Sequence, residues 1–106
     1  MTAPTVAWLG GRLVPWAEAV VPIEDRGLQF SESLYEVVPV TAGAARLVAE
    51  HAERMANGAA FLGLPGGSPP AAEWERVAGL LLAEERLPEG LRYAQLTGGC
   101  APRAPL

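Results

Sequence analysis

The sequence predicts an α+β domain, in which two helices pack on one face of an antiparallel β-sheet. Three observations support this fold class. A Gly-Gly pair separates two short apolar runs, residues 34–40 alternate as a strand does, and two later segments carry apolar residues at helical spacing. Along the chain the order is hairpin, strands, two helices and a final strand, which is typical of an α+β domain rather than of a parallel βαβ sheet.

The first expected element is a β-hairpin formed by Val6–Leu9 and Arg12–Pro15. Gly10 and Gly11 join the two runs, and glycine adopts the positive φ of a tight hairpin turn without a Cβ clash. A further short extended piece is expected at Ala19–Ile23, where Pro22 restricts it to an edge or a strand end. Gly27 then follows a charged triplet and is expected to reverse the chain.

The next element is a strand at Leu34–Val40, because the segment is rich in β-branched residues and alternates. Thr41–Ala45 is expected to be a turn, and Arg46–Val48 could pair back as another strand. Two faces follow from the alternation, one formed by Leu34, Glu36, Val38 and Val40 and the other by Tyr35, Val37 and Pro39.

A helix is expected at Ala49–Leu62, with Glu50 and Arg54 at the favourable i,i+4 spacing for an ion pair. Gly63 ends it, and Ser68 is the candidate N-cap of a second helix that ends near Arg86. Leu91–Thr97 alternates again and is expected to be a strand. The predicted apolar stripes are Ala52, Met55, Ala56, Ala59, Ala60 and Leu62 in the first helix, and Trp74, Val77, Ala78, Leu81 and Leu82 in the second.

Composition restricts the kinds of partner. The 106 residues suit one domain, and eight Arg against twelve Asp plus Glu give a net charge of −4, which argues against a nucleic-acid partner. No apolar run approaches the ~20 residues of a membrane helix, and no signal peptide is recognised. Cys100 is the single cysteine, so no internal disulfide can form and a reducing, cytoplasmic setting is expected.

Few side chains suggest chemistry by themselves. Arg54 is interpreted as a solvated or ion-paired helix arginine, and Tyr35 as a half-buried strand aromatic. His51 is the only histidine, and without cysteines or clustered carboxylates it makes a poor metal ligand. Arg103 is a charge near the chain end, and no general base accompanies Cys100 in the sequence. We therefore expect no metal site and no catalytic residue in this chain.

Three motifs, taken together, resemble the fold-type IV pyridoxal-phosphate enzymes, which include the D-amino-acid and branched-chain aminotransferases. The first is Ile23–Val38 (IEDRGLQFSESLYEVV), a charged turn that leads into a strand carrying Tyr35 inward. The second is Glu50–Met55, which matches the family's E-H-x-x-R-(L/M) element. The third is Thr97–Pro105, which resembles the family's T-R-G-x-x-P-R-x-H loop. The resemblance spans Trp8 to Arg103.

The resemblance implies roles for three residues. Arg54 would bind the phosphate of pyridoxal 5′-phosphate, Tyr35 would contact the substrate carboxylate, and Arg103 would belong to a carboxylate trap that reaches a neighbouring subunit's site. His51 would be structural. The chain departs from the family pattern at four positions, where Ser31 and Ser33 replace glycines, Gly98 replaces an arginine and Pro105 replaces a histidine.

The sequence contains no lysine, although this family holds its cofactor through a lysine Schiff base. Residues 1–106 are therefore interpreted as the small N-terminal domain of a class IV aminotransferase-like protein, without the C-terminal cofactor domain. The intact enzyme would move an amino group between an amino acid and a 2-oxo acid, and the chain alone would be inactive. Two alternatives stay open: an aminodeoxychorismate-lyase-like fragment, and a non-catalytic truncated or dimerisation domain. A homodimer is expected.

Overall fold

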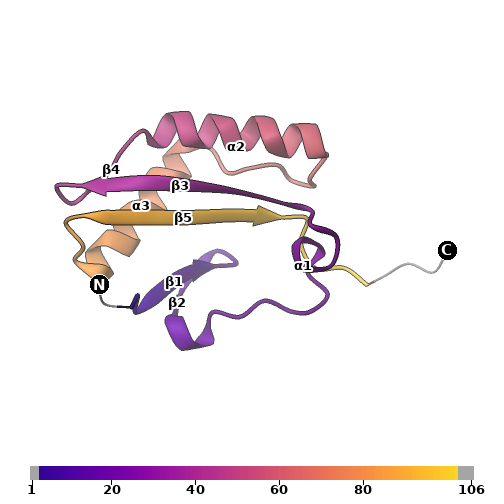
Figure 1. The fold of residues 1–106 in the computed structure, drawn as a ribbon, viewed down its shortest axis with the longest axis horizontal. Helices are drawn as coiled ribbons and strands as arrows, with labels where there is room; N and C mark the ends of the chain where they lie inside the picture. The colour runs from indigo at the N-terminus through magenta and orange to yellow at the C-terminus, as the bar shows by residue number, and fades with distance from the viewer. Residues whose placement is uncertain (1–2, 103–106) are drawn as a thin grey trace.

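A computed structural model describes residues 3–102 and has the expected α+β architecture (Figure 1). Three helices, five strands and a single 3₁₀ turn make up this part of the chain. In chain order they are β1 (Val6–Leu9), β2 (Arg12–Pro15), η1 (Trp16–Glu18), α1 (Arg26–Phe30), β3 (Ser33–Thr41), β4 (Ala44–Ala45), α2 (Val48–Leu62), α3 (Ala71–Glu85) and β5 (Gly90–Thr97).

The main sheet is antiparallel and has the strand order β4-β3-β5. The long pairing joins β3 to β5, from Ser33 opposite Thr97 to Val40 opposite Gly90. The predicted hairpin forms as well, but β1 and β2 make a separate two-stranded sheet. The hairpin is attached to α3 instead of to β5, since the Arg76 guanidinium lies 5.3 Å from the Trp8 ring centroid.

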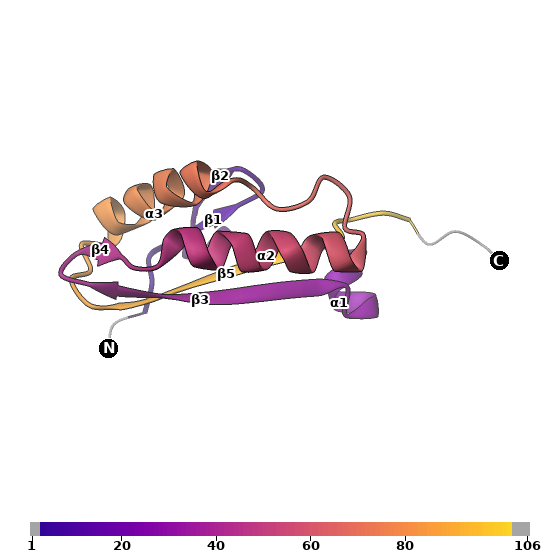
Figure 2. The ribbon, with the colours of Figure 1, turned by 90° about the horizontal axis from the view of Figure 1, so that it is seen from above.

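Both long helices cover the same face of the main sheet, as predicted (Figure 2). The alternation of β3 explains this arrangement, because Val38 and Val40 are buried beneath the helices whereas Tyr35 and Val37 are exposed on the other face. The buried core cluster consists of Val38 from β3, Val48, Ala52 and Met55 from α2, and Trp74 from α3.

Trp74 connects three parts of this core. Its indole Nε1 donates a hydrogen bond to the Pro69 carbonyl at 3.2 Å, and its own carbonyl accepts one from Arg92 Nη1 at 2.9 Å. The Arg92 guanidinium also lies 5.1 Å from the Trp74 ring centroid. Burial lowers the pKa of Arg92, and the charge of Glu75 opposes that effect. The indole and the guanidinium together link α3 to β5.

Several predicted local details were wrong. Helix α1 was missed, because Gly27 does not simply reverse the chain: Asp25 caps a five-residue helix by accepting a hydrogen bond from the Gly27 amide at 2.8 Å. Ser68 is not the cap of α3, since the extended residue Pro70 occupies that position and no side chain caps the helix. Residues 19–23 form no strand.

The entry to α2 also differs from the prediction. The returning strand β4 is Ala44–Ala45, and Leu47 takes a left-handed conformation (φ 55°) that starts the helix at Val48. The buried face of α2 is narrower than the predicted stripe, because the sheet and α3 cover only one side of it. Val48, Ala52, Met55 and Ala59 are buried, whereas Ala56, Ala60 and Leu62 are exposed.

A carboxylate near the end of α3 fixes the start of the described chain. Glu85 Oε1 accepts hydrogen bonds from the Thr5 amide at 2.7 Å, the Thr5 hydroxyl at 2.9 Å and the Val6 amide at 2.8 Å. The Thr5 amide, then the Val6 amide and the Thr5 hydroxyl, lower the pKa of Glu85. The ionised carboxylate therefore favours the docked hairpin.

The lowered pKa gives a testable dependence on pH. Glu85 should stabilise the docked hairpin fully above the ordinary pKa of a glutamate, and the contribution should disappear as the pH falls through the lowered pKa of the folded state. We expect the protection factor of the Val6 amide, which is its exchange rate corrected for the intrinsic pH-dependent rate, to fall over that range in the parent chain. In Glu85→Gln the protection factor should be low already at pH 7 and depend less on pH. Glu84→Gln, at an exposed neighbour, is the control; a parent-like profile in Glu85→Gln would contradict the prediction.

Candidate functional site

A buried carboxylate organises the one cluster of charged side chains between β3 and α2 in residues 3–102. Glu36 is 6% exposed and lies on the helix-facing side of β3. Its Oε2 lies 2.8 Å from His51 Nδ1, and its Oε1 lies 2.9 Å from Arg54 Nε. His51 and Arg54 are three residues apart on α2, so they project from the same side of the helix. We call Glu36, His51 and Arg54 the Glu36 cluster.

Arg54 is held at one end and open at the other. Its side chain is 79% exposed, although its Nε is bound to a carboxylate that is 7% exposed. Within residues 3–102 the structure gives it no other ion pair, so the expected partnership with Glu50 was wrong. The two Nη groups remain accessible from solvent. A guanidinium with this fork free can bind an anion such as a phosphate with two parallel hydrogen bonds.

His51 is a structural member of the cluster in this arrangement. Its contact with Glu36 occupies Nδ1, and its side chain is 20% exposed. The structure contains no group of three or more His, Cys, Asp or Glu side chains that could hold a metal ion within residues 3–102. In that same range, no helix is long and apolar enough to cross a membrane.

Tyr35 does not point inward as expected. Tyr35 immediately precedes Glu36 on β3, and its side chain points to the opposite side, because successive strand residues face opposite sides of a sheet. Its side chain is 64% exposed and stacks on Tyr93 of β5, with ring centroids 5.4 Å apart and planes inclined by 16°. Tyr35 therefore lies on the face of the sheet opposite to Glu36. Arg103, the third predicted site residue, lies outside the described residues.

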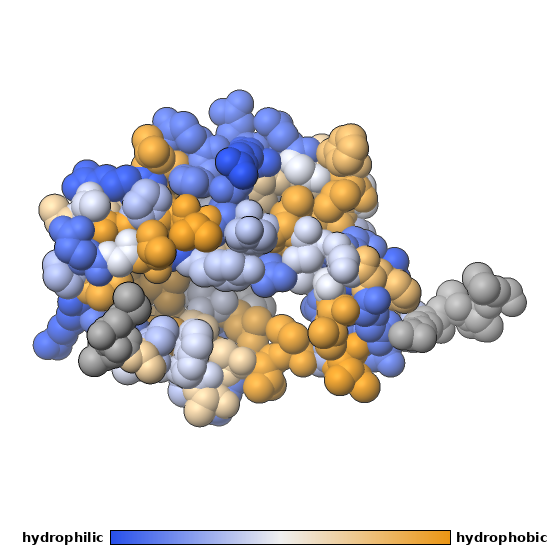
Figure 3. Space-filling view, in the orientation of Figure 1, coloured by the Kyte–Doolittle hydropathy of each residue, from blue (hydrophilic) through white to orange (hydrophobic). Residues whose placement is uncertain are grey.

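The sheet face that carries Tyr35 has no helix over it. Figure 3 shows hydrophobic residues interspersed with hydrophilic ones on this side of the molecule. Its exposed side chains come from the two long strands, namely Tyr35 and Val37 of β3 with Leu91 and Tyr93 of β5. We call these four residues the open sheet face. An exposed apolar group of this kind is typical of a surface that contacts another domain, subunit or ligand.

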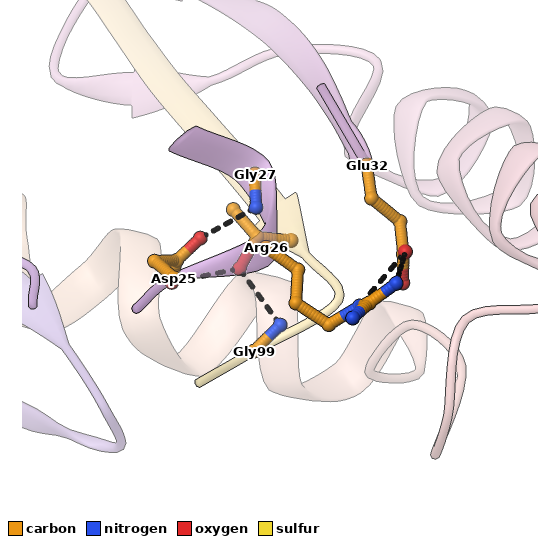
Figure 4. Close-up of polar contacts among 6 residues, drawn as sticks. Asp25, Arg26, Gly27, Glu32 and Gly99 are labelled. Carbon is orange, nitrogen blue, oxygen red and sulfur yellow. Dashed lines mark hydrogen bonds and ion pairs between the residues drawn. The ribbon is translucent and has the colours of Figure 1, made fainter. Parts of the chain in front are cut away.

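A second charged group lies just before the start of β3, where α1 meets the end of β5 (Figure 4). Arg26 Nε and Nη2 both lie 3.0 Å from Glu32 Oε2, and the Arg26 guanidinium is 4.9 Å from the Phe30 ring centroid. The Arg26 amide donates to the Gly99 carbonyl at 2.8 Å. These contacts join the charged turn to the glycine pair that follows β5.

Gly98 is enclosed by this junction. Its amide donates to the Glu32 carbonyl at 3.0 Å, and a Cβ added to Gly98 would overlap Glu32 Oε1. The Glu32 carboxylate thus occupies the space that a side chain at position 98 would need. A side chain at position 98 would therefore displace the Glu32 carboxylate from its contact with Arg26.

Sequence reasoning proposed Arg54 as a site residue but did not propose Glu36, whose carboxylate bonds its Nε. The signal was present in the alternation of β3, because Glu36 falls on the same face as Leu34, Val38 and Val40. A carboxylate on an apolar face needs a cationic or hydrogen-bonding partner to be buried there. A search of the next helix for cations three residues apart would have found His51 and Arg54.

Comparison with known proteins gives one consistent group of relatives. The chain is 37% identical over 93 residues to a D-alanine aminotransferase from Bacillus licheniformis, a match that covers 88% of this chain and 32% of the relative. It is also similar to a solved fold IV transaminase from Curtobacterium pusillum, with a TM-score of 0.69 and 28% identity over 84% of this chain and 32% of that one.

A third similar protein carries a different activity in its description. It is a putative 4-amino-4-deoxychorismate lyase from Legionella pneumophila, with a TM-score of 0.76 and 27% identity over 84% of this chain and 32% of that one. No family model matches the sequence. The chain spans about a third of the length of the curated relatives it matches.

Proposed function

We propose that this chain, an N-terminal part of the fold-type IV aminotransferase class, acts as the small domain of an enzyme that uses pyridoxal 5′-phosphate. The reaction of the whole enzyme would be transfer of an amino group between an amino acid and a 2-oxo acid. Support comes from the D-alanine aminotransferase relatives and from the fold. The observation that carries the proposal is the oriented, solvent-open guanidinium of Arg54.

Arg54 is the residue that would hold the cofactor, through its phosphate. The donor set fits this group, because a dianionic phosphate needs charged, paired donors and the two Nη groups of Arg54 supply them. When bound, pyridoxal phosphate supplies an electron sink for the substrate's α-carbon. The sequence has no lysine, so the amine that anchors the cofactor covalently and shuttles the proton must come from residues outside this chain.

Tyr35 and Arg103 are proposed to orient the substrate. The hydroxyl of Tyr35 can donate to a carboxylate oxygen from the open sheet face, and Arg103 would add a positive charge. The open sheet face is also where the proposed homodimer or a further domain would make contact. A cytoplasmic setting is proposed from the lone cysteine.

An alternative in the same class is an enzyme like 4-amino-4-deoxychorismate lyase, and the solved relative of that description favours it. The two activities differ in substrate, and a comparison of aminotransfer from D-alanine with lyase turnover in a full-length protein containing this domain would separate them. A non-catalytic truncated or dimerisation domain is the third candidate, favoured by the absence of lysine. Transaminase turnover by the 106-residue chain alone would contradict its proposed inactivity.

The role of Arg54 can be tested with pyridoxamine 5′-phosphate, which has no aldehyde to react with the chain's α-amine. We expect the chain to bind this probe more tightly than pyridoxamine, measured by NMR titration of amide and arginine side-chain signals. Arg54→Ala should weaken phosphate-probe binding by about 10- to 100-fold, since a hydrogen-bonded charge contributes roughly 1.5–3 kcal/mol. Arg54→Lys should fall between, because it keeps the charge without the fork.

The matched control is Arg46→Ala, which removes another exposed arginine near the start of α2. Arg46 donates to the Thr41 hydroxyl and carbonyl and does not touch the Glu36 cluster. It should leave the affinity for pyridoxamine 5′-phosphate nearly unchanged. Equal losses in Arg46→Ala and Arg54→Ala would mean that only overall charge attracts the probe, and the assignment of Arg54 would then be wrong.

A further inference from the structure

We propose that Glu36 is a positioning residue for phosphate binding, which acts by fixing the guanidinium of Arg54. This inference rests on the proposed function, since it assigns a positioning role at the same phosphate site. Glu36 itself does not touch the anion. It holds Arg54 by Nε, so the chain presents the Nη edge of the guanidinium in one orientation before any ligand arrives.

The geometry divides the two oxygens of Glu36 between two partners. Oε2 lies 2.8 Å from His51 Nδ1 and Oε1 lies 2.9 Å from Arg54 Nε. His51 thereby fixes the rotation of the carboxylate, and the carboxylate fixes the guanidinium. Because Glu36 is 6% exposed and lies on a central strand, this chain of contacts is anchored in the core.

The high exposure of the Arg54 side chain explains why the bond from Glu36 matters for phosphate binding. An arginine side chain that is 79% exposed would otherwise sample many rotamers, and binding a phosphate would have to order them. The bond to Glu36 orders the side chain in advance, which raises affinity through preorganisation. It engages Nε and leaves the bidentate fork to the ligand.

A buried carboxylate beside a phosphate site also has an opposite effect, because its negative charge repels the anion. The two effects make different predictions when the charge is removed. If Glu36 positions Arg54, neutralising it weakens phosphate binding. If Glu36 only compensates charge, neutralising it strengthens phosphate binding.

Glu36→Gln tests this distinction with nearly the same side-chain shape. A glutamine keeps one oxygen acceptor, and a neutral acceptor makes a weaker bond to the guanidinium. We expect the dissociation constant for pyridoxamine 5′-phosphate to rise about tenfold, with no change for pyridoxamine. Unchanged or tighter phosphate binding in Glu36→Gln would overturn the inference.

The matched control is Glu53→Gln. Glu53 precedes Arg54 on α2, is exposed, and makes no recorded ion pair within residues 3–102. Its neutralisation removes the same charge nearby without releasing Arg54, so phosphate binding should stay the same or tighten slightly. Loss of affinity in Glu53→Gln equal to that in Glu36→Gln would also count against positioning.

A measurement on the unmodified chain covers the case in which Glu36→Gln does not fold. The Arg54 Nε–H proton, whose NMR signal is assigned by its loss in Arg54→Lys, should exchange slowly with water. On titration with pyridoxamine 5′-phosphate, this signal should shift together with the signals of Glu36 and His51. An Arg54 Nε–H as fast as those of arginines without a carboxylate partner would contradict positioning. Absence of any phosphate response at Arg54 in the unmodified chain would instead contradict the proposed function, so the two failures are distinguishable.

Discussion

Replacing Trp74 by alanine is expected to remove about 3–5 kcal/mol of folding free energy, which is the usual cost of deleting a buried tryptophan. Trp74 is 4% exposed and belongs to the core cluster between the helices and the sheet. Its loss would also remove the indole donor to the Pro69 carbonyl and the ring beneath Arg92. A domain of this size has only about 5–15 kcal/mol of stability in total. The substitution should therefore remove a large fraction of the free energy of unfolding.

Urea denaturation followed by far-ultraviolet circular dichroism measures this effect. Trp16→Ala is the matched control, because Trp16 is 53% exposed on η1 and its deletion should change the free energy of unfolding by no more than about 0.5 kcal/mol. A loss for Trp74→Ala no larger than that for Trp16→Ala would show that the core is not where the structure places it.

The second large effect is expected at Gly98. A methyl group there would overlap the Glu32 carboxylate, which must then leave its position against Arg26. Losing the hydrogen-bonded contacts between these two side chains commonly costs about 0.5–1.5 kcal/mol. We expect Gly98→Ala to lower the free energy of unfolding by that amount, and Gly98→Arg to lower it at least as much.

A double-mutant cycle identifies the cause. In a Glu32→Ala background the obstructing carboxylate is gone, so Gly98→Ala should cost much less, with a coupling of about 0.5–3 kcal/mol between the two positions. Gly79→Ala is the control: no atom lies within 4 Å of its added Cβ in helix α3, so it should be neutral or stabilising. Additive losses at positions 32 and 98 would rule out the proposed conflict.

Much of the fold could be predicted from periodicity because its long elements have clear patterns. The alternation in 34–40 gave the correct faces of β3, and the spacing of Trp74, Val77 and Ala78 gave the buried side of α3. Helix α1 could not be found in this way, since five residues are too short for a periodic pattern and the helix depends on the Asp25 cap. The contact of the hairpin segment with α3 could not be found either, since Thr5 and Glu85 are 80 residues apart in sequence.

The site was only partly accessible from the sequence. Arg54 was proposed through a resemblance of motifs, and its binding role stays a prediction; the structure shows that its side chain is 79% exposed. Its true partner was misjudged because local spacing favoured Glu50, whereas the buried Glu36 offers a stronger interaction in a less polar setting. The inward expectation for Tyr35 failed because the opposite face of β3 has no covering layer in residues 3–102.

The strand pairing of the main sheet has a consequence for how the chain reaches its fold. Strand β5 pairs with β3, but both long helices lie between them in sequence, so Thr97 must meet Ser33 across 64 positions. Closing such a loop is slow compared with forming a helix, because entropy is lost before the contacts form. During synthesis, α2 and α3 can form while β3 still lacks its main neighbour. The core should therefore become protected from solvent in one late step, once residues 90–97 have been made.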